Sequence, residues 1–372
     1  MNKERMIENF LEMVKIHSPS NNEGLYAEYL IKLLKELDGE IYLDNGYKNY
    51  GGNAPVIFAK FKGNLAGNGV TLAAHMDVIE PSLGVNPIIE NNIIKTDGTT
   101  TLGGDDKAGI ASIIEVLRTI KENKLEHRDI FVLLTPCEEA GMLGAKNIDW
   151  SSVPATMKPA MNMLVIDNAG KAGLIAHTAP SKYGITFTFT GKKAHAGIEP
   201  EKGINAICMA AHAISNMKIG RIDEFTTSNI GSINSDFPTN VVSDCCIFTA
   251  ELRGHSEEKI IEMLNNYEEA CKNAALLFGG EYTMEKSHDY PALKPKDDLK
   301  FAKEFAKIYE EIGIDSELKI IGGGSDSNIL AKEGFNSIII GVGMYNVHTV
   351  NEYLVTDDLF KTTEAILKYI TK

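Results

Sequence analysis

The sequence has few cysteines, no long apolar run and no cluster of basic residues, and each absence excludes a class of protein. Its five cysteines among 372 residues show no C-x-x-C spacing, so we expect reduced thiols rather than disulfides or zinc ligands. No apolar stretch approaches the roughly 18 residues that a membrane span needs. The 37 basic residues are outnumbered by 51 acidic ones, which disfavours nucleic acid because phosphates need a basic surface. We therefore look for a small-molecule site.

The amino-terminal segment also lacks a secretory signal. Its first 18 residues carry charges throughout and contain neither an apolar core nor a small-residue cleavage site, so we expect a cytoplasmic protein. The content of 44% hydrophobic and 24% charged residues is typical of a globular protein with a sizeable core. The length predicts about two domains.

The order of the patterns predicts one α/β domain that a second domain interrupts. Helical periodicity alternates with strand-like apolar runs in the first half of the chain, with helices over 3–16, 23–37 and 107–122 and strands over 55–61, 70–75, 130–135 and 161–167. From Tyr183 the pattern changes to alternating strands with helices over 203–216 and 257–277, and after Pro291 the first pattern resumes. We therefore assign residues 1–177 and 290–372 to the first domain and residues 178–289 to an inserted α+β domain.

Acidic residues and histidines follow several of the predicted strands, where α/β sheets place their ligands. They are His75 and Asp77, Asp105 and Asp106, Glu138 and Glu139, Asp167, and His348. Each alone has an ordinary explanation, such as a polar turn, a solvated acidic loop or a helix cap. Together, imidazoles and carboxylates form the ligand set of a hydrolytic zinc, manganese or cobalt site, with enough ligands for two ions bridged by one carboxylate.

The spacing within these segments suggests different roles for neighbouring residues. Asp77 lies two residues after His75, so a continued strand would place both on one face, where the carboxylate can orient the imidazole ring. Asp105 and Asp106 repel each other unless a cation neutralises one of them. In the pair of glutamates, one side chain can bind a metal while its neighbour faces another direction.

Five segments, taken in order, resemble the dinuclear metallopeptidases related to peptidase T, within the M20 aminoacylase and carboxypeptidase superfamily. They are His75-Met-Asp, Leu102-Gly-Gly-Asp-Asp-Lys-Ala-Gly, Cys137-Glu-Glu-Ala-Gly, Ile166-Asp-Asn and the late His348. The resemblance covers nearly the whole chain. It implies a metallopeptidase-type catalytic domain, with a mixed central sheet flanked by helices, and an inserted lid domain.

The same resemblance implies a role for each residue of the site. His75 and Asp167 would bind one metal ion, Glu139 and His348 would bind the other, and Asp105 would bridge the two. Asp77 would orient His75, and Glu138 would be the general base. Asp106 would follow Asp105 through a cis peptide bond.

The resemblance also implies substrate contacts outside the metal site. His195 would reach the substrate carbonyl oxygen, although a histidine after a strand can equally be structural. Asn240 and Arg253 would hold a substrate carboxylate, which the planar guanidinium binds in a bidentate way. A surface ion pair with Glu251 is the alternative for Arg253.

A glycine-rich segment supplies the last candidates. Gly322-Gly-Gly-Ser-Asp-Ser-Asn328, with Gly323 and Ser325, would bind the end of the peptide. A phosphate loop is the competing interpretation, but the segment lacks the G-x-x-x-x-G-K-[ST] spacing.

These residues predict a metal-dependent exopeptidase of short peptides, of the tripeptide aminopeptidase type. It would use two divalent ions per chain, with zinc as the first candidate and manganese or cobalt as alternatives. An N-acyl-amino-acid deacylase or carboxypeptidase remains the alternative within the superfamily, and a non-catalytic metal-binding or assembly protein remains the alternative outside it. We expect no nucleic-acid or membrane partner, and we leave monomer and homodimer open.

Overall fold

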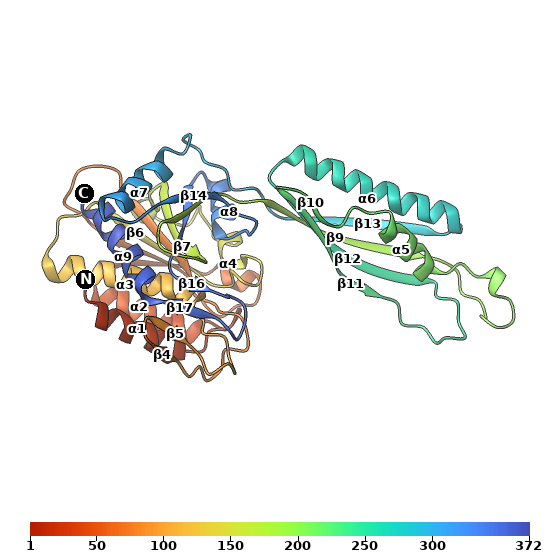
Figure 1. Cartoon of the computed structure of the whole chain (residues 1–372), viewed down its shortest axis with the longest axis horizontal. Helices are drawn as coiled ribbons and strands as arrows, with labels where there is room; N and C mark the ends of the chain where they lie inside the picture. The colour runs from red at the N-terminus through yellow and green to blue at the C-terminus, as the bar shows by residue number, and fades with distance from the viewer. The chain divides into compact units, whose positions relative to one another are not determined.

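The computed structural model describes residues 1–372, which form two compact units (Figure 1). Unit 1 comprises Met1–Thr178, Lys294–Ile321 and Ser325–Lys372, and unit 2 comprises Ala179–Leu293 and Gly322–Gly324. No helix in either unit is long and apolar enough to cross a membrane.

Unit 1 is built on a mixed sheet of eight strands in the order β1-β2-β6-β3-β7-β15-β8-β14. Its strands are β1 (Glu40–Asp44), β2 (Val56–Phe61), β3 (Val70–His75), β6 (Ile130–Thr135), β7 (Asn162–Asn168), β8 (Leu174–Thr178), β14 (Glu317–Ile320) and β15 (Asn336–Gly341). The neighbours β6, β3, β7 and β15 run parallel. Every residue of β3 is buried, as a parallel strand covered on both faces requires.

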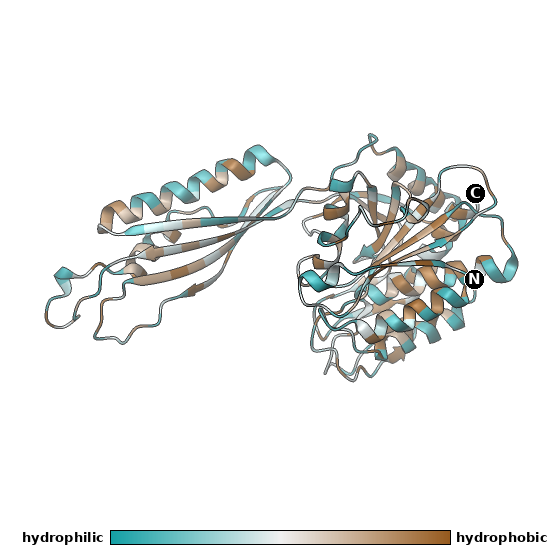
Figure 2. Cartoon of the chain, turned by 180° about the vertical axis from the view of Figure 1, so that it is seen from behind, coloured by the Kyte–Doolittle hydropathy of each residue, from teal (hydrophilic) through white to brown (hydrophobic).

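Long amphipathic helices cover this sheet. They are α1 (Lys3–Lys15), α2 (Gly24–Glu36), α3 (Gly104–Asn123), α7 (Lys300–Glu311) and α9 (Thr356–Thr371). In α7 the residues Phe301, Phe305 and Ile308 recur at helical spacing and are buried. Figure 2 shows the same division, with hydrophobic central strands and helices that have one hydrophilic side. The helix α3 packs against β3 and β7, so its amino-terminal end lies near the ends of those strands.

Smaller elements complete unit 1. A second sheet joins β16 (Met344–Tyr345), β17 (Tyr353–Val355), β5 (Ile93–Lys95) and β4 (Ile88–Glu90), and two short helices are α4 (Leu143–Lys146) and α8 (Asp326–Leu330). The 3-10 helices are η1 (Gly46–Asn49), η2 (Ala155–Met157) and η4 (Ala331–Glu333).

Unit 2 is an antiparallel sheet of five strands in the order β10-β11-β12-β9-β13 with two helices. The elements are β9 (Ser181–Thr190), η3 (Pro200–Lys202), α5 (Ala206–Ser215), β10 (Gly220–Asp223), β11 (Thr226–Asn234), β12 (Cys245–Gly254), α6 (Glu257–Phe278) and β13 (Glu281–Tyr290). Alternate residues of β9, namely Ile185, Phe187 and Phe189, form a core with the buried faces of α5 and α6. This alternation is the expected signature of a sheet with one covered face.

The predicted α/β class, with a mixed central sheet and flanking helices, is confirmed. Several strands were not predicted from the sequence, namely β1, β4, β5, β8, β10, β13, β16 and β17. Most of them are short, and β13 is mostly exposed and rich in charged residues. Charges on an edge strand oppose pairing with other chains, and they also hide the apolar alternation that identifies a strand.

Candidate metal centre

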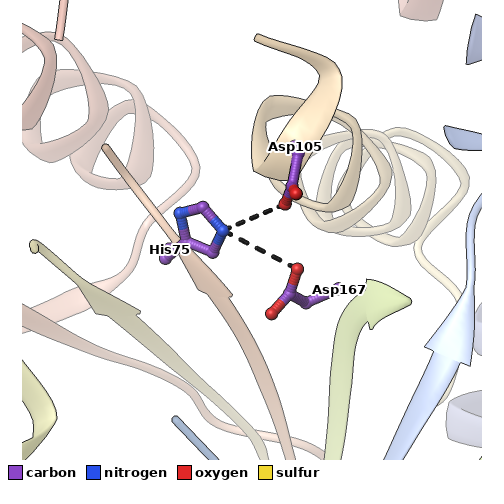
Figure 3. Close-up of side chains that lie close together, drawn as sticks. All are labelled: His75, Asp105 and Asp167. Carbon is purple, nitrogen blue, oxygen red and sulfur yellow. Dashed lines mark hydrogen bonds and ion pairs between the residues drawn. The ribbon is translucent and has the colours of Figure 1, made fainter. Parts of the chain in front are cut away.

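Three of the predicted ligands lie at the carboxyl ends of parallel strands or at the start of the adjoining helix. His75 is the last residue of β3, Asp167 lies near the end of β7, and Asp105 lies at the start of α3 (Figure 3). Glu139 follows β6, and His348 follows β15 and β16. Because parallel neighbours end at one edge of the sheet, residues far apart in sequence meet there.

These ligands form two groups that share one residue. His75 Nε2 lies 3.1 Å from Asp105 Oδ1 and 3.6 Å from Asp167 Oδ1. His348 Nε2 lies 2.8 Å from Glu139 Oε1 and 3.2 Å from Asp105 Oδ2. The potential ligand atoms within each group all lie within 4.8 Å of one another. Asp105 therefore turns one carboxylate oxygen toward each group.

The donor set fits divalent cations. Imidazole nitrogens and carboxylate oxygens are the ligands of zinc and related metals in hydrolytic sites. Glu139 Oε1 is buried and accepts no hydrogen bond, although His348 Nε2 lies 2.8 Å away. A buried carboxylate oxygen without a hydrogen bond costs free energy, which a bound cation would offset.

The charges of the site also favour a cation. Burial opposes protonation of His75, but the carboxylates of Asp167, Asp105 and Asp77 outweigh it and raise the His75 pKa well above its usual range. The Asp105 and Glu139 carboxylates raise the His348 pKa to about 10. Burial and, to a lesser extent, repulsion from the Asp105 carboxylate raise the pKa of Asp167 to about 7. This concentration of negative charge is what two divalent ions would neutralise.

Asp106 belongs to neither ligand group. The peptide bond between Asp105 and Asp106 is cis, as the resemblance implied. Asp106 Oδ1 accepts from Gly109 N at 3.1 Å, in the manner of a helix cap, and Oδ2 accepts from His75 N at 3.3 Å. The two adjacent carboxylates therefore serve different partners, and Asp106 joins the start of α3 to the end of β3.

Asp77 joins His75 to the loop of Glu138 and Glu139. His75 Nδ1 lies 3.0 Å from the backbone oxygen of Asp77 and 3.4 Å from Asp77 Oδ1. The Asp77 carboxylate accepts from Glu138 N at 2.9 Å, from Glu139 N at 3.1 Å and from the Ser20 hydroxyl at 2.7 Å. Asp77 thus fixes both a histidine ring and the backbone of the glutamate pair.

Glu138 differs from its neighbour Glu139. It is 9% exposed and belongs to neither ligand group. Burial, together with nearby carboxylates including Asp326, raises the Glu138 pKa well above its usual range. Such a carboxyl holds a proton readily, which is what proton transfer requires.

The predicted substrate residues of unit 2 lie at two ends of its sheet. His195 and Asn240 are exposed neighbours, since Ala196 N donates to the Asn240 backbone oxygen at 2.9 Å. Arg253, on β12, lies opposite Lys182 near the start of the neighbouring strand β9. His195 follows the other end of β9. The stretch of β9 from Lys182 to Thr190 spans about 26 Å at about 3.3 Å per residue.

Arg253 and the glycine-rich segment are engaged locally. Arg253 donates from Nε to Glu251 Oε1 at 2.9 Å and from Nη2 to Glu251 Oε2 at 3.2 Å. Ser325 caps α8, because its hydroxyl accepts from Ser327 N at 3.3 Å. Gly323 is exposed. The substrate roles of these residues stay predictions.

Two buried carboxylates beside the site were missed by the sequence analysis. Asp326 accepts from the Thr135 hydroxyl, its Oδ1 has no partner, and burial raises its pKa to about 6. Glu352 accepts from the backbone of the loop that carries Asp105. The Ser-Asp-Ser-Asn sequence could have suggested Asp326, whereas nothing near Glu352 indicates its partner.

Comparisons with known proteins show the family of this chain. The model of peptidase family M20/M25/M40 matches residues 71–372. The uncharacterized protein YqjE of Bacillus subtilis (strain 168) is 37% identical over 370 residues, which is 100% of this chain and 98% of that protein.

Two crystal structures cover the whole chain. Aminopeptidase PepT from Bacillus cereus ATCC 10987 is 34% identical with a TM-score of 0.91, and 100% of this chain and 98% of that chain are covered. A tripeptidase from Staphylococcus aureus subsp. aureus Mu50 is 33% identical with a TM-score of 0.94 and the same coverage.

Proposed function

This chain is a peptide hydrolase that belongs to peptidase family M20/M25/M40, and from that premise we propose that it is a dinuclear aminopeptidase of short peptides, of the tripeptide aminopeptidase type. The observation that supports two ions is Asp105, whose oxygens face two separate imidazole and carboxylate groups. The likeness to an aminopeptidase and to a tripeptidase supports the substrate class.

Each ion would have its own ligands and would share Asp105. His75 and Asp167 would hold one ion, and Glu139 and His348 would hold the other, with zinc the first candidate and manganese or cobalt the alternatives. Bound there, such ions supply Lewis acidity that activates water and polarises the scissile carbonyl.

Glu138 would move the proton. It would accept a proton from the attacking water and deliver it to the leaving amine nitrogen. Its place outside both ligand groups supports this role, as does the fixed backbone that Asp77 provides. Asp77 would also hold the ring of His75 in the orientation that metal binding needs.

Residues of unit 2 and of the glycine-rich segment would bind the substrate. His195 would donate a hydrogen bond to the oxyanion that develops on the scissile carbonyl. Asn240 and Arg253 would hold a substrate carboxylate, for which Arg253 would exchange its present partner Glu251. Gly323 and Ser325 would bind the end of the peptide. A cytoplasmic location stays a prediction.

The test of the base is Glu138→Gln. We expect two bound ions by elemental analysis and a loss of about 10²- to 10⁴-fold in kcat on a tripeptide. Loss of metal from the variant would make Glu138 a ligand and refute the assignment. Wild-type enzyme should be assayed on a panel of dipeptides, tripeptides and N-acylated amino acids with zinc, manganese or cobalt. Preferred cleavage of N-acylated substrates would instead make it a deacylase.

The geometry of unit 2 also leads us to propose a homodimer. About 26 Å of sheet separates the Arg253 end from the His195 end, which is longer than a tripeptide of about 10 Å. If both residues contact one tripeptide, two copies of the chain must supply them, because one unit 2 cannot.

Mixing two impaired variants tests this arrangement. His195→Ala and Arg253→Ala chains, unfolded together and refolded, should recover about a quarter of wild-type kcat/KM, more than either variant alone, since half of the dimers are mixed and half of their sites are intact. A monomer in solution, or no recovery of activity, would refute the shared site.

A further inference from the structure

Glu352 contacts the loop of the bridging aspartate through three hydrogen bonds. Its side chain lies just before β17, and the residue is 2% exposed. Oε2 accepts from Leu102 N and from Gly103 N, both at 2.9 Å, and Oε1 accepts from Asp105 N at 2.9 Å. The three backbone N–H groups offset part of the free energy that burying this carboxylate costs.

The two glycines of this loop make the contact feasible. Gly103 has φ of +68°, a left-handed conformation that lets successive N–H groups converge on one anion. At Gly104 an added Cβ would lie 3.0 Å from Glu352 Oε1, so the absence of a side chain allows the carboxylate to approach. The Leu-Gly-Gly-Asp sequence is therefore shaped to bind a carboxylate from elsewhere in the chain.

Glu352 belongs to the same loop as a proposed metal ligand. The loop between β16 and β17 contains His348 near its middle and Glu352 at its end. Glu352 N donates to the Thr349 backbone oxygen at 3.1 Å, which closes a turn between the two. The loop thus reaches Asp105 twice, through His348 Nε2 and through the backbone contact of Glu352.

We propose that Glu352 is a positioning residue of the metal centre, which holds loop 102–105 so that Asp105 presents one carboxylate oxygen to each ligand group. The inference rests on the proposed dinuclear centre. Because Asp105 is shared by both groups, a displaced loop weakens both ions together. A role in folding alone would lower stability and leave metal affinity unchanged.

The experiment measures metal binding by competition with a chelator in wild type, Glu352→Gln and Glu115→Gln. The glutamine keeps the size of the side chain but turns an amide group toward backbone donors. We expect the affinity for both ions to fall about 10- to 100-fold in Glu352→Gln, as for other partners that orient metal ligands. Glu115 is the matched control, since it is buried on α3, accepts from Asn2 N at 2.7 Å and from Arg5, and belongs to neither ligand group.

A second variant tests the contact from the other side. Gly104→Ala places its Cβ against Glu352 and should lower metal affinity by a similar factor. The double variant Glu352→Gln/Gly104→Ala should then bind metal no more weakly than the weaker-binding single variant, because both changes break the same interaction. Additive losses would overturn the inference.

The outcomes separate the inference from the proposed function. Two ions in wild type with unchanged affinity in Glu352→Gln would overturn the positioning role and leave the dinuclear centre intact. An equal loss of metal affinity in Glu115→Gln would overturn it too, because the effect would be general destabilisation. Fewer than two ions in wild type would refute the centre itself.

Discussion

The two units place their candidate functional residues in opposite ways. In unit 1 most of the proposed metal ligands lie at the ends of parallel strands, and the buried carboxylates of Asp77 and Glu352 accept from the backbone N–H groups of the loops that carry Glu139 and Asp105. In unit 2 His195 and Asn240 lie on exposed loops, and Arg253 lies at the other end of the sheet. The antiparallel sheet distributes polar residues along one exposed face, whereas the parallel sheet collects them at one edge.

This difference suggests that unit 1 binds the metal ions and unit 2 contributes contacts to the substrate. A metal centre requires ligands held to within a few tenths of an ångström, and the buried edge of unit 1 provides that rigidity. Substrate contacts must form and break in each turnover, which exposed side chains on loops permit. Changes to the proposed ligands of unit 1 should therefore alter metal binding, and changes to the substrate residues of unit 2 should alter turnover or substrate affinity alone.

Asp105→Ala should have the largest effect. It removes the shared ligand, so we expect both ions to be lost and activity to fall to the level of chelator-treated wild type. Glu139→Ala is the matched variant, because Glu139 belongs to one ligand group only. It should lose one ion and keep the other. Elemental analysis of both variants checks this, and one retained ion in Asp105→Ala would show that Asp105 is not shared.

His195→Ala should lower kcat by about 10²- to 10³-fold without loss of metal, because it removes one donor to the oxyanion. His212→Ala is the control, since His212 is on α5 of the same unit and packs against Phe278. Metal content and steady-state kinetics measure the result. Unchanged kcat on a tripeptide would exclude His195 from the reaction.

Metal removal should destabilise unit 1 selectively. Ligand present at about 100 times its dissociation constant adds about 2.7 kcal/mol, and all residues of the two ligand groups belong to unit 1. After EDTA treatment, hydrogen exchange should therefore accelerate in β3 and β7 and stay unchanged in β9 and β12. Equal acceleration in both units would show that metal binding stabilises the whole chain rather than unit 1.

Arg253→Ala should have the smallest effect, raising KM about tenfold through the loss of one charged hydrogen bond to substrate. Arg253→Lys should not restore KM, because lysine lacks the planar fork. Arg221→Ala serves as control, since Arg221 lies on β10 and donates only to the backbone of Glu224. If KM stays the same, Arg253 serves only its ion pair with Glu251.

The sequence was sufficient to predict the fold class, the family and the parallel strands that end at the site. Those strands are continuous apolar runs, and His75, the Glu138–Glu139 pair and Asp167 lie at or just after their ends, so the apolar pattern and the position of the polar residues agree. A helix cap, one of the ordinary explanations considered for these polar residues, is what Asp106 provides.

The supporting contacts could not be predicted because they join distant segments. Glu352 lies 247 residues from Asp105 in sequence, and the turn around it resembles any polar loop. Arg253 was equally compatible with a substrate contact and an ion pair, and its bidentate contact with Glu251 became visible only in the folded sheet. The pairing of β12 with β9 places Arg253 opposite Lys182, at the end of the sheet far from His195. This pairing joins strands that are distant in sequence, so the sequence around Arg253 does not show it.

The place of β15 in the central sheet determines the order in which the chain can fold during synthesis. This strand lies between β7 and β8 but follows unit 2 in sequence. The sheet of unit 1 is therefore split while unit 2, which is nearly continuous in sequence, already has all its strands and can fold as the chain emerges. His348 and Glu352 come later still, so the proposed centre acquires its last ligand and its support only after unit 2 and every strand of the central sheet have been made.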